Sequence, residues 1–339
     1  MMPVVGIRES RAWWYTALVS ATVVGLLGGY AVGVYSVAQA DSSKSGIGSS
    51  ILVGDITRTY SVHLPTGHTS LQGLPVLLAF NTGLGNGTSM NALTQLNTVA
   101  DSDGFAVVYP DGYDQSWNDG RGTTAAQRAG VDDVTFVSDL INHLVSQGAE
   151  KSRFYATGFS GGAMFTEYLG CRLATQLAGI APVAGPLPTL DVSNCLPARP
   201  LQVLLIAGGA DPTVPFGGGT VGVGSGGGNV LSAQSTASFW RAADNCAQTP
   251  VISNPPNTVT DGTSVQASVA TGCAGGSGVE FLTILHGGHT WPGGLQYLPA
   301  AVVGKTTRQF GASAQLAAYF GLAPGSGAGS GSSASSGSS

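Results

Sequence analysis

Runs of apolar residues alternate with amphipathic segments along most of this chain, and they predict a regular succession of strands and helices. Residues Pro75–Phe80 are apolar without interruption, which is typical of a strand buried on both faces of a sheet. Apolar and polar residues alternate over Thr57–Leu64, which predicts a half-exposed edge strand. Apolar residues at helical spacing over Asp133–Val145 predict an amphipathic helix.

The same patterns predict the other elements and, from their order, the fold class. Helices are expected over Ala92–Ala100, Ser235–Ala243 and Thr307–Tyr319, and strands over Ala106–Tyr109, Arg153–Thr157, Ile180–Val183, Leu201–Ala207 and Val279–Leu285. The glycine-rich segment Gly217–Asn229 is expected to be a loop. Because strand and helix alternate throughout, we predict a single α/β domain whose mostly parallel sheet is covered by helices on both faces.

The first 40 residues have the features of an export signal. Arg8 and Arg11 precede the apolar run Trp13–Val37, and Ala38-Gln39-Ala40 gives a small-x-small cleavage pattern. The run could also span a bilayer as an uncleaved anchor, which would be the chain's only contact with a membrane. We therefore divide the chain into a signal segment (1–40), a polar linker (41–50), a folded domain (51–323) and a Gly/Ser tail (324–339) expected to be disordered.

Charge and cysteine content narrow the class of protein. Charged residues make up 9% of the chain and the net charge is -5, so the chain lacks the basic balance of a nucleic-acid binder. Four cysteines without a C-x-x-C pair argue against a zinc site and, in an exported chain, predict two disulfides. Three pairings are possible. We favour Cys171–Cys195 and Cys246–Cys273, because each closes a short interval of sequence.

The most informative motif is a G-x-S-x-G pattern placed between a predicted strand and a predicted helix. Gly158-Phe159-Ser160-Gly161-Gly162 follows the strand Arg153–Thr157 and precedes the helical run Ala163–Leu169. With 52 glycines in 339 residues, about one such pattern is expected by chance, so the flanking elements carry the evidence. Strand, sharp turn and helix make Ser160 a candidate nucleophile of the elbow type.

A serine nucleophile needs a base and an orienting carboxylate, which follow it in the order acid, histidine in this fold. The order leaves only His286 and His289, which come just after the strand ending at Leu285. Asp211 follows the buried strand Leu201–Ala207 and is the candidate acid, although Asp-Pro is also a common turn. The oxyanion hole is expected from the backbone of Gly161 and of the glycine-rich loop Asn81–Gly87.

The chain resembles the extracellular polyhydroxybutyrate depolymerase and feruloyl/acetylxylan esterase family of α/β-hydrolases from about Ser61 to about Leu322. The matching strings are Val108-Tyr109-Pro110-Asp111-Gly112, Ser116-Trp117-Asn118, Val131-Asp132-Asp133-Val134, the elbow, Ala181-Pro182-Val183-Ala184-Gly185, Ala210-Asp211-Pro212-Thr213-Val214-Pro215 and Gly288-His289-Thr290-Trp291-Pro292-Gly293. The resemblance implies Ser160 as nucleophile, Asp211 as acid and His289, in preference to His286, as base. It also supports the two short-range disulfides.

Several residues keep two interpretations. Trp117 and Trp291 could line the substrate site, together with Asn81, or be packed core aromatics. Asp132 and Asp133 are better explained as an acidic pair at a helix N-terminus than as functional groups. His286 could pair with His289 on a metal, but no helical metal-binding motif supports this.

The resemblance has one departure: where the family has His-Gly at the start of the oxyanion loop, this chain has Asn81-Thr82. The second oxyanion donor is then expected to be the amide of Thr82 or Gly83, which any side chain allows.

We predict a secreted, monomeric serine esterase that needs no cofactor or metal. Its expected substrate is a hydroxyalkanoate polyester or oligomer, with feruloyl or acetyl esters of plant polysaccharide as the alternative. A cutinase or lipase, or an exported binding protein that has lost catalysis, are further possibilities. The altered oxyanion loop is the feature that favours the last of these.

Overall fold

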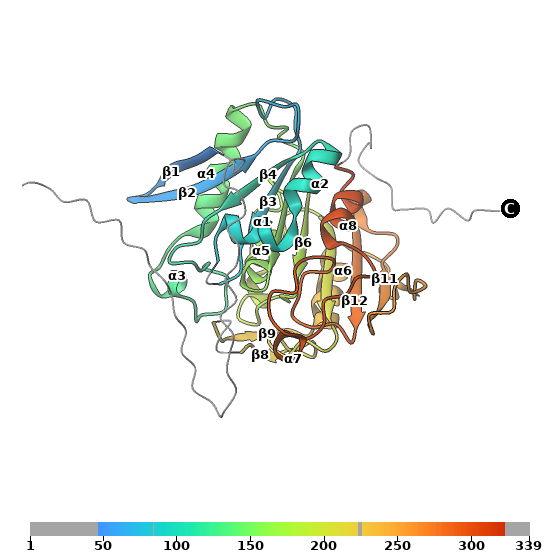
Figure 1. The fold of residues 1–339 in the computed structure, drawn as a ribbon. Helices are drawn as coiled ribbons and strands as arrows, with labels where there is room; N and C mark the ends of the chain where they lie inside the picture. Colours follow the sequence, from blue (N-terminus) through green and yellow to red (C-terminus); the bar gives the residue numbers. More distant parts are fainter. Residues whose placement is uncertain (1–46, 84, 223–225, 323–339) are drawn as a thin grey trace, which may run out of the picture. The chain divides into compact units, whose positions relative to one another are not determined.

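A ten-stranded sheet with helices on both faces forms the framework of the described part of the chain, beside a small sheet of two strands (Figure 1). The structure is a computed structural model that describes residues 47–83, 85–222 and 226–322. Across the sheet the strands follow the order β1-β2-β4-β3-β5-β6-β7-β12-β11-β10. Neighbouring strands from β4 to β12 in this order run parallel. The pairs at the two edges are antiparallel: β1 with β2 and β2 with β4 at one edge, and β12 with β11 and β11 with β10 at the other. The predicted fold class is therefore confirmed.

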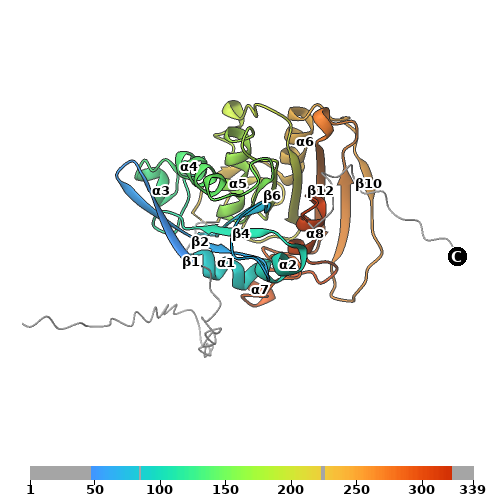
Figure 2. The ribbon, with the colours of Figure 1, turned by 90° about the horizontal axis from the view of Figure 1, so that it is seen from above.

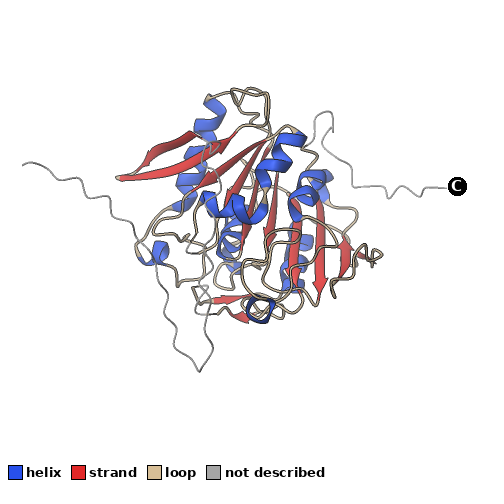
Figure 3. Cartoon of the chain, in the orientation of Figure 1, coloured by secondary structure: helices blue, strands red, loops and turns tan. Residues whose placement is uncertain are grey.

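The elements are distinguished by colour in Figure 3. The strands are β1 (Ile47–Val53), β2 (Ile56–His63), β3 (Val76–Phe80), β4 (Ala106–Pro110), β5 (Phe154–Phe159), β6 (Gly179–Val183), β7 (Gln202–Gly208), β8 (Gly219–Thr220), β9 (Asn229–Val230), β10 (Val251–Ser253), β11 (Ser264–Val269) and β12 (Gly278–Leu285). The helices are α1 (Gly87–Thr94), α2 (Leu96–Asp103), α3 (Ala125–Arg128), α4 (Asp133–Ser146), α5 (Gly161–Arg172), α6 (Ala233–Ala243), α7 (Ala300–Val303) and α8 (Ala312–Tyr319). Short 3-10 turns cover Val192–Asn194 and Ala274–Gly276.

Two apolar cores lie on opposite faces of the sheet. Helices α4, α5 and α6 pack on one face and α1, α2 and α8 on the other, as the view along the sheet shows (Figure 2). Strand β3 serves both cores, because Val76, Leu78 and Phe80 belong to one and Leu77 and Ala79 to the other. This two-sided burial explains why the strand reads as an unbroken apolar run in the sequence.

The first edge of the sheet differs from the prediction. Residues 47–50, expected to end the polar linker, belong to β1, where Ser49 and Ser50 pair with Tyr60 and Thr59 of β2. The predicted edge strand is therefore the second strand of the sheet. An edge strand is held by backbone hydrogen bonds to its one neighbour and can carry polar side chains, so apolar patterning does not reveal it.

Other boundaries also differ. The helix expected over Ala92–Ala100 is two helices, because Gln95 adopts the left-handed conformation with φ 55° between α1 and α2. The last helix begins at Ala312 and not at Thr307, because Gly311 before it has an extended backbone with φ -103° and ψ 120°. The expected glycine-rich loop contains the short strand β8, which pairs antiparallel with β9 at the end of the loop.

The predicted signal segment, residues 41–46 of the linker and the Gly/Ser tail lie outside the described residues. Within the described ranges, no helix combines the length and the apolar character needed to cross a membrane.

Candidate active site

Ser160 lies on a tight turn between β5 and α5, with φ 58° and ψ -117°. This conformation is strained for a residue with a side chain. Glycines on both sides allow it: a Cβ on Gly158 would lie 2.2 Å from the carbonyl oxygen of Gly162, and a Cβ on Gly162 would lie 2.2 Å from that of Phe80. The turn therefore needs small residues at these two positions, as an elbow requires.

The structure brings Ser160, His289 and Asp211 into one hydrogen-bonded series. The Ser160 Oγ lies 2.9 Å from His289 Nε2, and His289 Nδ1 lies 2.7 Å from Asp211 Oδ2. The three residues follow β5, β12 and β7, whose carboxyl ends meet at one edge of the sheet. An imidazole that donates its Nδ1 proton to Asp211 presents Nε2 as an acceptor for the serine hydroxyl.

Backbone groups hold the acid in place. Asp211 Oδ1 accepts hydrogen bonds from the amides of Thr213 at 2.7 Å and Val214 at 2.8 Å, which leaves Oδ2 facing the histidine. The turn at Asp-Pro and the catalytic interpretation of Asp211 are thus compatible, because one carboxylate oxygen organises the turn and the other meets His289.

The loop after β12 is fixed at His289 by contacts on several sides. The His289 amide donates to Val303 at 2.6 Å, and its carbonyl accepts from the Tyr297 hydroxyl at 2.8 Å. Burial, with a smaller contribution from the charge of Asp211, raises the pKa of Tyr297 to about 12, so the phenol keeps the proton it donates. The imidazole also lies against the Phe159 ring, with centroids 4.9 Å apart. Ser160 and His289 expose only 1% and 4% of their surface.

The loop after β3 bends around the side chain of Asn81. Its Nδ2 donates to the carbonyls of Thr82 and Gly85, each at 2.8 Å, and the Gly85 amide donates to Thr82 at 3.1 Å. A Cβ placed on Gly161 would lie 3.6 Å from the amide nitrogen of Gly83. Of the two amides expected as second donor, that of Gly83 therefore lies beside Gly161, where the first turn of α5 begins with unpaired N–H groups.

Asn81 itself is buried and engaged in shaping this loop. Both tryptophans are also buried with their indole N–H groups paired. Trp117 donates to the Asn81 carbonyl at 3.1 Å and stacks on Phe165, with ring centroids 4.7 Å apart. Trp291 donates to the Ser313 hydroxyl at 3.1 Å. These contacts agree with the interpretation of both indoles as core aromatics.

The other candidate residues from the sequence, Asp132, Asp133 and His286, make contacts outside the Ser160–His289–Asp211 series. Asp132 caps α4 by accepting from the Thr135 amide at 2.9 Å, and buried Asp133 forms an ion pair with Arg58 at 2.6 Å. His286 is exposed and lines a surface hollow of about 350 Å³ with Thr258 and Gly262.

Both predicted disulfides, Cys171–Cys195 and Cys246–Cys273, are confirmed. Among the described residues, Cys171, Asp191 and Cys195 form the one group of close metal-type ligands, and its two cysteines are joined in a disulfide.

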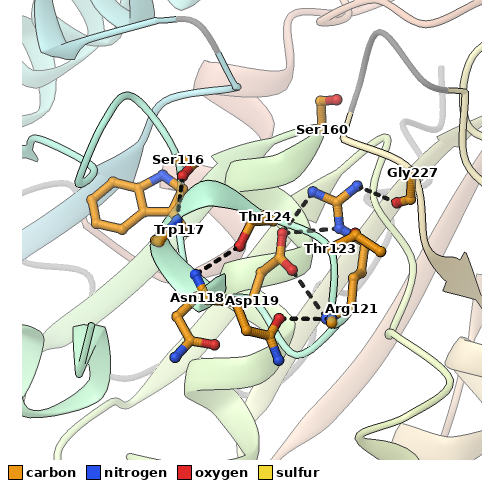
Figure 4. Close-up of polar contacts among 12 residues, drawn as sticks. Ser116, Trp117, Asn118, Asp119, Arg121, Thr123, Thr124, Ser160 and Gly227 are labelled. Carbon is orange, nitrogen blue, oxygen red and sulfur yellow. Dashed lines mark hydrogen bonds and ion pairs between the residues drawn. The ribbon is translucent and has the colours of Figure 1, made fainter. Parts of the chain in front are cut away.

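The sequence interpretation missed a buried ion pair beside the elbow. Asp119 and Arg121 follow the Ser-Trp-Asn string directly, and their oxygen and nitrogen approach to 2.7 Å (Figure 4). The sequence does contain a signal for this pair: two opposite charges lie within three residues in a chain where charged residues are rare.

The chain is similar to known esterases. Residues 109–221 match the family described as Phospholipase/Carboxylesterase. The chain is 30% identical over 269 residues to the protein named Putative esterase NocK of Nocardia uniformis subsp. tsuyamanensis, across 76% of this chain and 78% of that protein. It is also 30% identical over 240 residues to Feruloyl esterase B of Piromyces equi, across 68% of this chain and 42% of that enzyme, and so spans less than half of it.

The acetyl xylan esterase from Aspergillus awamori has a similar fold, with a TM-score of 0.51 at 16% identity over 72% of this chain and 94% of that structure. The fold is that of the α/β-hydrolases. Within this class the chain belongs to the phospholipase/carboxylesterase family, and it is a serine esterase.

Proposed function

We propose that this esterase removes acyl groups from plant polysaccharide by way of an acyl-enzyme on Ser160. The observation that carries the mechanism is the continuous series of hydrogen bonds from Ser160 through His289 to Asp211. A serine hydroxyl is a weak nucleophile, and a histidine base held by a carboxylate is the arrangement that activates it.

In the proposed reaction, Ser160 attacks the ester carbonyl while His289 Nε2 takes the hydroxyl proton. Asp211 keeps the imidazole in the required tautomer and stabilises its positive charge. The amides of Gly161 and Gly83 (or Thr82) donate to the oxyanion, and His289 then returns the proton to the leaving alcohol. Water, activated by the same histidine, cleaves the acyl-enzyme and releases the acid.

The named relatives support the proposed substrate class. Feruloyl Esterase B of Piromyces equi is named for feruloyl esters, which favours feruloyl or acetyl groups on polysaccharide over the hydroxyalkanoate esters that we first expected. The departure at Asn81 gives little support to a catalytically silent protein. The Asn81 side chain bonds carbonyl groups of the loop and does not occupy the backbone amides proposed to bind the oxyanion. Two disulfides support an extracellular location, since the cytosol keeps most thiols reduced.

The test compares three release reactions with the same enzyme preparation: ferulate from arabinoxylan, acetate from acetylated xylan, and 3-hydroxybutyrate from its oligomers. We expect the first or second to proceed at the highest kcat/KM, with Ser160→Ala inactive on all three and unlabelled by a fluorophosphonate probe. Preferential cleavage of the oligomers would reject the polysaccharide assignment, and full activity of Ser160→Ala would reject the mechanism.

A further inference from the structure

A carboxylate and a guanidinium lie buried next to the proposed nucleophile (Figure 4). Asp119 and Arg121 expose 1% and 4% of their surface. Asp119 Oδ2 accepts from Arg121 Nε at 2.9 Å and from Nη2 at 2.7 Å, and Oδ1 accepts from the Arg121 amide at 3.1 Å. This set of hydrogen bonds fixes the guanidinium in one orientation.

The guanidinium reaches the place where the oxyanion donors meet. A Cβ placed on Gly161 would lie 3.5 Å from Arg121 Nη2 and 3.6 Å from the Gly83 amide nitrogen. In the view of Figure 4 the guanidinium lies between the Asp119 carboxylate and Ser160. The positive end of the ion pair therefore lies beside the two amides proposed to bind the oxyanion.

Arg121 also contacts a second segment of the chain at this point. Its Nη1 donates to the Gly227 carbonyl at 3.0 Å, and Cβ atoms placed on Gly226 or Gly228 would come within 3.3 Å and 2.8 Å of its side chain. One guanidinium thus joins three parts of the sequence: the segment after Trp117, the start of α5 and residues 226–228.

Stability alone is a weak explanation for this pair. Burial raises the pKa of Asp119, against the opposing effect of Arg121, so removal from water disfavours the carboxylate even with its partner present. Buried ion pairs can often be replaced by apolar residues without loss of stability. A charged pair at this position is explained better by a charge that the reaction uses.

We propose that Arg121 adds its positive charge to the oxyanion hole and that Asp119 is the positioning residue that holds it there. As negative charge develops on the carbonyl oxygen, a fixed guanidinium beside the Gly161 and Gly83 amides stabilises the transition state more than the neutral ester. This proposal rests on the proposed role of Ser160 as nucleophile, and it does not depend on the identity of the natural substrate.

The test uses p-nitrophenyl acetate, a small neutral ester, and separates kcat from KM. The central variant is the double substitution Asp119→Asn with Arg121→Gln, which removes both charges and avoids an unpaired buried ion. We expect its kcat to fall about 10-fold to 100-fold, somewhat less than the roughly 100-fold to 1000-fold loss typical for a direct oxyanion donor, while KM changes less than about threefold. Arg121→Lys keeps the charge without the planar fork, and its kcat should lie between those of the double variant and the wild type.

Arg172→Gln combined with Asp191→Asn is the matched control, because it also removes both charges of an ion pair and leaves no buried ion unpaired. Arg172 also forms an ion pair, with Asp191, and it ends the same helix that Ser160 begins, about 18 Å away at 1.5 Å per residue. Its kcat should equal that of the wild type. Titration with a fluorophosphonate probe counts the sites with a reactive serine in each preparation, so that misfolded protein does not lower kcat.

Equal kcat per labelled site in the double variant and the control would overturn the proposal, as would an Arg121→Lys variant no faster than the double variant. If the Ser160→Ala variant hydrolysed the ester as fast as the wild type, the proposed mechanism itself would be wrong. The proposed role of Arg121 would then be wrong as well.

Discussion

Trp240 donates a hydrogen bond from its indole Nε1 to Oε2 of Glu167 at 2.6 Å, joining α6 to α5 inside the core behind the elbow. Both side chains are fully buried, and the other oxygen of Glu167 is without a hydrogen-bond partner among the described residues. Burial, only partly opposed by the indole hydrogen bond, raises the pKa of Glu167 to about 8. The folded protein therefore carries this carboxyl as a neutral acid at neutral pH.

We predict that the free energy of unfolding falls as pH rises from about 4.5 to about 8. In this window the folded state keeps a proton on Glu167 that the unfolded chain, with a pKa of 4.5, releases, so alkali favours unfolding. The contribution of Glu167 is complete below pH 4.5 and is lost on the scale of a few kcal/mol as pH approaches about 8. Urea unfolding of the wild type and Glu167→Gln across this range measures it.

The glutamine variant should show a clearly flatter pH dependence, because it holds the same shape without a titrating group. Some slope remains, since burial also raises the pKa of Asp244 to about 6. Glu150→Gln, at a half-exposed surface position, is the control and should keep the wild-type slope. An unchanged slope in Glu167→Gln would show that the buried acid does not titrate in this range.

The hydrogen bonds of Asp211 predict how an asparagine at this position would change the tautomer of His289. Two backbone amides hold its Oδ1, so in Asp211→Asn the amide oxygen takes that position and the NH₂ group faces His289 Nδ1. The imidazole must then carry its proton on Nε2 and cannot accept one from Ser160. We expect kcat for p-nitrophenyl acetate to fall by about 10⁴-fold with the fold intact, measured by steady-state kinetics and circular dichroism.

Asp261→Asn is a suitable control for this substitution. Asp261 also organises a turn, by accepting from the Thr263 amide at 2.8 Å and its hydroxyl at 2.6 Å, but it holds no histidine. Its variant should lose some stability and keep kcat. A similar loss of kcat in the two variants would mean that Asp211 acts through the fold and not through His289.

Asn81 provides a test of the oxyanion loop. Asn81→Asp replaces the amide that donates to Thr82 and Gly85 by a carboxylate, which faces their two carbonyl oxygens instead. We expect kcat to fall at least about tenfold and stability to fall by about 1–3 kcal/mol, because buried acceptors lose their donor. Asn81→Ala should have a smaller effect on both, because it adds no charge. Kinetics with p-nitrophenyl acetate and thermal unfolding measure the two effects, and an Asn81→Asp enzyme with wild-type kcat would contradict the role of this side chain.

Chain order predicted Ser160 and Asp211 and narrowed the base to His286 or His289, and the family resemblance selected His289. Each candidate follows a predicted strand, and parallel strands bring their carboxyl ends to one edge of the sheet. For this reason the structure finds them within hydrogen-bond distance although 129 residues separate Ser160 from His289.

Contacts between loops could not be predicted in the same way. The distance between Arg121 and Gly161 depends on how the segment after β4 folds over α5, and no periodic pattern records that path. The left-handed Gln95 and the first four residues of β1 were missed for a related reason: their conformations are set by neighbours and not by their own residue types.

The last prediction concerns the two disulfides, which close loops of similar length. Cys171–Cys195 spans 24 residues and ties the end of α5 to the loop after β6, and Cys246–Cys273 spans 27 and ties the end of α6 to the turn before β12. On the chain-entropy account, a crosslink of this span lowers the entropy of the unfolded chain by a similar amount in either place. Replacing either pair with alanines should therefore cost about 3 kcal/mol of unfolding free energy, with kcat at 25 °C unchanged.

Urea unfolding of the two double-alanine variants and of the variant lacking both pairs measures these costs. The crosslinks lie in different segments, so the effects should add to within about 0.5 kcal/mol. A cost much larger for Cys171–Cys195 alone would point instead to native packing, because both of its cysteines are buried whereas Cys273 is half-buried. The comparison thus separates an effect on the unfolded chain from one on the folded core that supports Ser160.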